Sequence, residues 1–108
     1  MIRRVGLIRR RSGLSPDEFF RHWIGEHAAL ARQIEGLRGY RINRVVDASP
    51  GCDWDGLGEL WFESASAAEE YLAGSSRLAR LIDEDLGRFV GDRITFYTEE
   101  HVILPPPR

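Results

Sequence analysis

His27 is the residue of this sequence whose type and position first point to chemistry. It lies in the stretch 15–34, SPDEFFRHWIGEHAALARQI, where apolar residues recur at helical spacing. The apolar members of that stripe are Phe19, Trp23, Leu30 and Ile34. His27 falls on the same stripe, although packing alone does not require an imidazole there. Because an imidazole moves protons near neutral pH, His27 is the first candidate for acid–base chemistry.

Glu59 is the second candidate, a carboxylate between Gly58 and Leu60 in a segment with the pattern of a central strand. A carboxylate in the middle of a sheet needs a partner, because an unpaired buried charge is costly. We expect either an arginine such as Arg41 or Arg44 to pair with Glu59, or the carboxylate to line a cavity.

Other reactive side chains lack a matching set of neighbours. His22 lies about 60° off the apolar stripe, so we expect it at the surface or the rim. In the run Glu99-Glu100-His101, only Glu99 and His101 share a face of a strand, so we expect a dimer contact there and no metal site. Cys52 lies in a loop without a neighbouring histidine, and we do not expect it to be a nucleophile.

The elements that position these groups follow from capping and periodicity. Ser15 and Glu18 form a capping box around Pro16, which predicts a helix from there to about residue 34. The segments 1–10, 37–47, 54–63 and 93–104 have the apolar patterns of strands. Before the last strand, a capping box at Ser66 predicts a short helix ending near residue 74, and Ser75 or Ser76 caps a further helical stretch.

The order strand, helix, strand, strand, helix, strand predicts an α+β, ferredoxin-like βαββαβ fold. Its four-stranded antiparallel sheet carries both helical regions on one face. Large side chains occupy both parities of the strands, for example Trp61 and Phe62. One helical layer cannot cover both faces, so we expect a homodimer in which the second face packs against another copy. Residues 1–104 are predicted to form a single domain, and 105–108 a proline-rich tail.

Composition argues against several kinds of partner and compartment. The chain has 108 residues and a net charge of −2, so we expect no nucleic acid or anionic membrane surface as a partner. No apolar run approaches the roughly 20 residues of a spanning helix. A single cysteine fits a reducing environment, and we expect a cytoplasmic protein.

Three segments carry a resemblance to a known family. They are 13–43, GLSPDEFFRHWIGEHAALARQIEGLRGYRIN, the strand GLGELWF, and the ending FYTEEHVI. The first contains Phe-x-x-x-Trp-x-x-x-His-x-x-Leu-Ala, then Gly-Leu and an aromatic residue entering the second strand. In these features the chain resembles the EthD family of the dimeric α/β-barrel superfamily. The resemblance implies a ferredoxin-like fold in which two sheets associate into a dimeric α/β barrel.

The resemblance does not imply a single reaction. The wider superfamily includes methylmuconolactone methylisomerase, polyketide cyclases and cofactor-free monooxygenases, whereas EthD itself accompanies a cytochrome P450 system that degrades ethyl tert-butyl ether. His27 and Tyr40 match positions at which related lactone isomerases carry polar active-site groups, so the resemblance nominates both as catalytic. A phenol can donate a hydrogen bond to a carbonyl or enolate oxygen. The alternative is a His27 bonded to a backbone carbonyl and a Tyr40 packed in the core.

The leading hypothesis is a cofactor-free enzyme of catabolism or secondary metabolism. It would bind a small apolar, oxygen-bearing metabolite between helices and sheet and isomerise or cyclise it by proton transfer. The residues expected to bind this ligand are Trp23, Glu59, Trp61 and Phe96. The alternatives are a non-catalytic partner of a P450-type oxidoreductase system and a cofactor-free monooxygenase. No cofactor or metal is expected.

Overall fold

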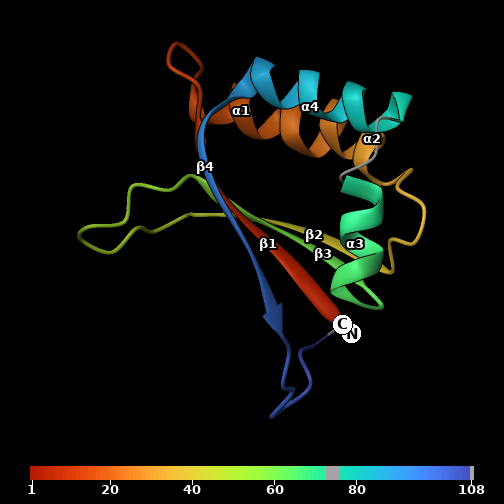
Figure 1. Ribbon diagram of the computed structural model, residues 1–108. Coiled ribbons are helices and arrows are strands. Elements are labelled where there is room, and N and C mark those ends of the chain that lie inside the picture. Colours follow the sequence, from red (N-terminus) through yellow and green to blue (C-terminus); the bar gives the residue numbers. More distant parts are fainter. Residues whose placement is uncertain (73–75, 108) are drawn as a thin grey trace.

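The computed structural model, which describes residues 1–72 and 76–107, contains one four-stranded antiparallel sheet (Figure 1). Its strands are β1 (Ile2–Arg10), β2 (Gly39–Arg44), β3 (Gly56–Phe62) and β4 (Val90–Glu99). They lie in the order β2-β3-β1-β4, and every neighbouring pair is antiparallel. This order confirms the predicted ferredoxin-like arrangement. Within one chain the sheet is open, with β2 and β4 as its edges, and it does not close into a barrel.

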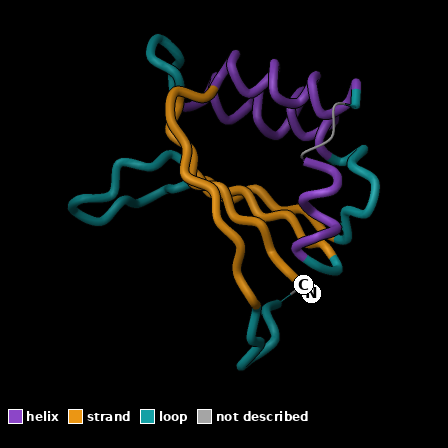
Figure 2. The backbone as a smooth tube through the Cα atoms, in the orientation of Figure 1, coloured by secondary structure: helices purple, strands orange, loops and turns teal. Residues whose placement is uncertain are grey.

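All helices lie on one side of the curved sheet, and the other side is bare (Figure 2). The first helical region is continuous and consists of α1 (Pro16–His22), the π-helical turn η1 (Trp23–His27) and α2 (Ala28–Ala31). The second consists of α3 (Ala65–Leu72) and α4 (Arg77–Phe89). In Figure 1, α4 lies alongside α1 over one end of the sheet, and α3 covers the other end.

Hydrogen bonds at the helix starts confirm two of the predicted caps and correct a third. Ser15 Oγ accepts from the Glu18 N–H at 3.1 Å and Glu18 Oε1 accepts from the Ser15 N–H at 3.2 Å, which confirms the first capping box. Ser76 caps α4, as one of the two predicted alternatives. The prediction for α3 was wrong by two residues, because Ser64 and not Ser66 accepts from a first-turn amide. The predicted end near residue 74 and the alternative cap at 75 lie outside the described residues.

The last strand corrects the predicted range of 93–104. It begins at Val90, because α4 continues through Gly87 to Phe89, whose burial on the apolar face outweighs the small helix cost of a glycine. It ends at Glu99, which pairs with Ile2, and β1 offers no partner beyond that residue. His101 therefore lies outside the sheet.

Two apolar clusters join the helices to the sheet. The first contains Ile8, Phe19, Trp23 and Phe89, and the second contains Ala31, Ile34, Phe62 and Ala68. The Trp23 ring lies directly on the backbone of β3, where a Cβ at Gly56 would come within 2.5 Å of its Cζ3 and one at Gly58 within 3.2 Å of its Cζ2. These two glycines make room for the largest buried side chain.

Among the described helices, none has both the length and the apolar content that crossing a membrane requires.

Candidate functional site

A widened helical turn brings two histidines to one side of the first helical region. His22 and His27 are five residues apart, which in a regular α-helix would separate them by about 140° around the axis. In η1 the Ala28 N–H bonds to the Trp23 carbonyl five residues back, so the turn holds more residues than an α-helical turn. Both imidazoles then face α4. His22 is half-buried and bonded, which corrects the expectation of a surface position.

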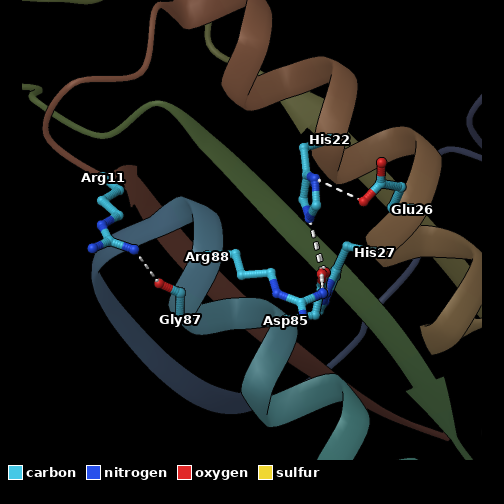
Figure 3. A network of polar contacts seen from close by, with 7 residues as sticks. All are labelled: Arg11, His22, Glu26, His27, Asp85, Gly87 and Arg88. Atoms are coloured by element: carbon cyan, nitrogen blue, oxygen red, sulfur yellow. Dashed lines mark hydrogen bonds and ion pairs between the residues drawn. The ribbon is translucent and has the colours of Figure 1, made fainter.

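The carboxylate of Asp85, on α4, accepts hydrogen bonds from both histidines (Figure 3). Its Oδ2 lies 2.9 Å from His27 Nδ1, and its Oδ1 lies 3.0 Å from His22 Nε2. Asp85 is only 2% exposed. Arg88, one turn further along α4, places its Nη1 3.5 Å from Asp85 Oδ1. A carboxylate can only accept hydrogen bonds, so each ring nitrogen facing it carries a proton. Glu26, 3.3 Å from His22 Nδ1, completes the group on the solvent side.

This arrangement fixes the state of His27. Burial lowers its pKa below the ordinary value of 6.5, and the hydrogen bond and charge of Asp85 oppose that shift. The ring is therefore neutral near pH 7, with its proton on Nδ1. Nε2 keeps its lone pair, and no residue in the described part of the chain bonds to it. A neutral imidazole of this kind accepts protons, which is what a general base requires.

A cavity of about 450 Å³ lies beside His27, between the helices and the sheet. Gly6 and Gly58, which face each other on β1 and β3, both line it. A Cβ added at Gly6 would have a single neighbour within 4 Å, Thr95 Cγ2 at 3.8 Å. The missing side chain at Gly6 therefore leaves open space in the middle of the sheet, whereas the space over Gly58 is taken by the Trp23 ring. Its volume is in the range typical of small-molecule sites.

Tyr40 on β2 lines the same cavity as His27 and Trp23. Burial raises the pKa of its phenol to about 12, and a side-chain hydrogen bond with Trp23 acts in the opposite direction. The group is thus a protonated hydrogen-bond donor at neutral pH. The structure brings together the two residues nominated as catalytic, with Trp23 as a wall between helix and sheet.

The other three predicted ligand-binding residues, Glu59, Trp61 and Phe96, do not line this cavity. Side chains alternate across a strand, and in β1 and β3 the even-numbered positions face the helices. Glu59 and Trp61 therefore lie on the bare face. Phe96, opposite Val5 in the register, lies on that face too.

Glu59 is paired there, but not with the residues expected. Arg3 Nη1 donates to its Oε2 at 2.5 Å and Asn43 Nδ2 donates to its Oε1 at 2.7 Å. Neither Arg41 nor Arg44 forms an ion pair with it. The Glu59 carboxylate is thus satisfied within the sheet rather than directed at a ligand.

The group of side chains that could hold a metal ion is not the pair Glu99 and His101 considered in the sequence analysis. His22, Glu26 and Asp85 each place one ligand atom within 4.8 Å of the others, whereas His101 and Glu99 are exposed and 3.9 Å apart. Both Asp85 oxygens already accept from histidine nitrogens. The primary role of this carboxylate is therefore to orient the two rings.

A family model described as EthD domain matches residues 11–93, most of the chain. No curated protein matches the sequence.

Solved structures with the same fold have low sequence identity to this chain. An EthD family protein from Bacillus halodurans C-125 is 20% identical, with 94% of this chain and 99% of that one covered and a TM-score of 0.77. A dimeric protein of unknown function from Bacteroides fragilis is 16% identical, with 92% and 95% covered and a TM-score of 0.65. A hydroxynitrile lyase from Passiflora edulis is 12% identical, with 96% of both chains covered and a TM-score of 0.74. At these identities the likeness concerns the fold.

Proposed function

The chain belongs to the EthD domain family, and from that premise we propose that it is a cofactor-free enzyme that moves a proton on a small organic molecule bound beside His27. The observation that carries the proposal is the bond from His27 Nδ1 to the buried Asp85, which leaves Nε2 without a partner in the described residues, on a ring that lines the cavity. The hydroxynitrile lyase among the structural neighbours supports it to the extent that a chain of this fold can carry a reaction.

In this mechanism His27 Nε2 removes a proton from a carbon next to a carbonyl group. The Nδ1–H bond to Asp85 stabilises the imidazolium that forms, because the positive charge then lies beside a buried carboxylate. Tyr40 donates a hydrogen bond to the oxygen on which negative charge develops. Return of the proton to a different carbon completes an isomerisation. In a cyclisation the enolate carbon attacks a second carbonyl carbon, and the alkoxide that forms takes the proton back from His27.

The proposal is tested by proton exchange, which needs no knowledge of the natural substrate. Small cyclic ketones, lactones and 1,3-dicarbonyl compounds are incubated with the protein in D₂O, and loss of their α-proton signals is followed by NMR. We expect the wild-type protein to accelerate exchange of at least one compound class. His27→Ala should abolish the acceleration, and Tyr40→Phe should reduce it by roughly 10- to 1,000-fold.

His101→Ala is the matched control, because it removes an exposed histidine outside the cavity. Equal exchange by wild type and His27→Ala would contradict the proposal. If no compound exchanges faster with the wild type, the alternative of a non-catalytic partner of an oxidoreductase is favoured.

The same proposal includes a homodimer formed through the bare face of the sheet. Ile94 and Phe96 on this face are 50% and 41% exposed. A ferredoxin-like neighbour is described as dimeric, which supports the idea. Pairing two open sheets through these faces would give the α/β barrel that one chain does not close by itself.

A further inference from the structure

Arg4 is a cation inside the cavity that the fold does not use. It lies on the central strand β1, half-buried, and its side chain faces the helices and lines the cavity. In the described part of the chain, no carboxylate forms an ion pair with its guanidinium and no oxygen accepts a hydrogen bond from it. Its neighbour Arg3, on the other face, is in contrast paired with Glu59. A half-buried charge without a partner is costly, so a folding role does not explain Arg4.

A second polar group in the cavity also lacks a partner. The hydroxyl of Tyr71, on α3, is buried and has no hydrogen bond to any described residue. Such groups are rare in native structures, since an unsatisfied buried hydroxyl loses its bonds to water. Arg4 and Tyr71 together offer several donors and no charge-bearing acceptor. They match a ligand group that only accepts hydrogen bonds, such as a carboxylate.

The electrostatics connect Arg4 with His27. Burial lowers the pKa of both Arg4 and His27, and the positive charge of Arg93, which also lines the cavity, adds to the shift of each. Arg93 has one weak ion pair, 3.9 Å from the exposed Asp83. Arg80 is a further cationic residue of the lining. Asp83 lines the cavity as well, but the three arginines outnumber it, so an anion in the cavity meets a net positive field, while the remaining walls, such as Trp23 and Phe62, are largely apolar.

We propose that the ligand of this cavity is a small carboxylic acid with a compact apolar ring, and that Arg4 is the residue that recognises its carboxylate. The planar guanidinium fork matches two carboxylate oxygens, and the Tyr71 hydroxyl can donate to one of them. The apolar body then lies over Gly6, beside the Trp23 ring. That the reacting carbon lies against His27 rests on the proposed function. Recognition of the carboxylate by Arg4 does not depend on it. This ligand is more polar than the apolar metabolite expected from the sequence.

The test compares acids with neutral molecules of the same shape. Benzoate and phenylacetate are titrated against benzamide and phenylacetamide by calorimetry or NMR, with phenyl phosphate as a further anion. We expect the wild type to bind at least one acid about 10- to 100-fold more tightly than its amide. Arg4→Gln should remove that difference. Arg32→Gln, which removes one positive charge at an exposed position outside the cavity, should keep it.

Thermal unfolding separates recognition from a structural role. Because Arg4 has no partner to lose, Arg4→Gln should unfold at the same or a higher temperature than the wild type. A clear decrease in the melting temperature would contradict the proposal, as would equal affinities for acids and amides or an acid preference that survives Arg4→Gln. Absence of binding by every acid, or tighter binding of phenyl phosphate, would also overturn it.

The outcomes also distinguish this proposal from the catalytic one. If acids bind in an Arg4-dependent way but no compound exchanges its α-protons, the carboxylate site is supported and the enzymatic function is overturned. If proton exchange depends on His27 but acids do not bind more tightly than their amides, the enzymatic function is supported and the carboxylate site is overturned.

Discussion

Asp85 Oδ2 lies 2.9 Å from His27 Nδ1, and the two residues come from helices that are adjacent in space but 58 positions apart in the chain. The carboxylate is buried, so its hydrogen bond determines which nitrogen of the imidazole carries the proton. The other nitrogen, on a ring that lines the cavity, is a proton acceptor. This pair therefore converts a core histidine into a candidate base.

The first prediction concerns this pair. In Asp85→Asn the amide can turn its N–H₂ toward His27, which places the ring proton on Nε2 and removes the free lone pair. Proton exchange should decrease by roughly 10²- to 10⁴-fold while the chain remains folded. Nitrogen-15 NMR of the histidine side chains should show the change of tautomer. Glu84→Gln, an exposed carboxylate on the same helix, is the control, and an unchanged His27 tautomer in Asp85→Asn would refute the explanation.

The second prediction concerns stability as a function of pH. Burial lowers the pKa of His27 below 6.5, so between the two values the unfolded chain binds more protons than the folded chain. The stability that neutral His27 contributes is fully present above pH 6.5 and is lost as the pH falls through the lowered pKa. The difference in free energy of unfolding between wild type and His27→Gln should therefore shrink with falling pH, in urea titrations from about pH 8 to 4.5. A difference that grows instead would mean that Asp85 outweighs burial.

The third prediction concerns Trp23, which is 1% exposed and packs against Phe19, Phe89 and the glycines of β3. Trp23→Ala should reduce the free energy of unfolding by roughly 3–5 kcal/mol, because it leaves a large void. Ile24→Ala, at a 52% exposed neighbour, should cost far less. Urea unfolding measures both, and a similar loss for the two variants would show that Trp23 is not central to the core.

Local sequence patterns were sufficient for the fold but not for the partners of the polar groups. The capping box at Ser15 and the alternation in β3 depend on neighbouring residues, and both were predictable. The partner of Glu59 was not, because it comes from β1, and the order of strands in the sheet is a property of the whole chain. Alternation along a strand also does not say which of its two faces meets the helices, and Trp61 and Phe96 lie on the bare face, outside the cavity.

Asp85 was missed although a signal for it existed. It lies three residues after Ile82 and four before Phe89, on the apolar stripe of α4, just as His27 lies on the stripe of the first helical region. A carboxylate and a histidine on facing apolar stripes predict a pair. The π-helical turn had no such signal, and without it His22 could not be brought to the same side.

The fourth prediction tests the homodimer. A charge on the bare face should be incompatible with close packing of two sheets, since it would be buried without a partner. Phe96→Glu should therefore shift the protein from dimer to monomer in sedimentation velocity experiments. Val46→Glu adds the same charge in an exposed loop and should leave the dimer intact. A wild-type chain that sediments as a monomer would refute the dimer itself.

The last prediction uses Gly6, which lines the cavity and has open space where a side chain would be. Replacing it by Ala, Val and Leu adds volume in steps, and the nearest neighbour of the first added carbon is Thr95 Cγ2 at 3.8 Å. The backbone of Gly6 is that of an ordinary strand, without positive φ, so these residues are tolerated there.

Affinity for the bound acid should therefore fall progressively from Gly6→Ala to Gly6→Leu, while the melting temperature stays constant or rises, because a β-branched or apolar residue replaces a flexible one. Gly58→Ala is the contrasting variant. Its Cβ would lie 3.2 Å from the Trp23 ring, so it should lower stability by displacing that ring. If the Gly6 series loses stability in parallel with affinity, the space above Gly6 is part of the packed core and not a ligand site.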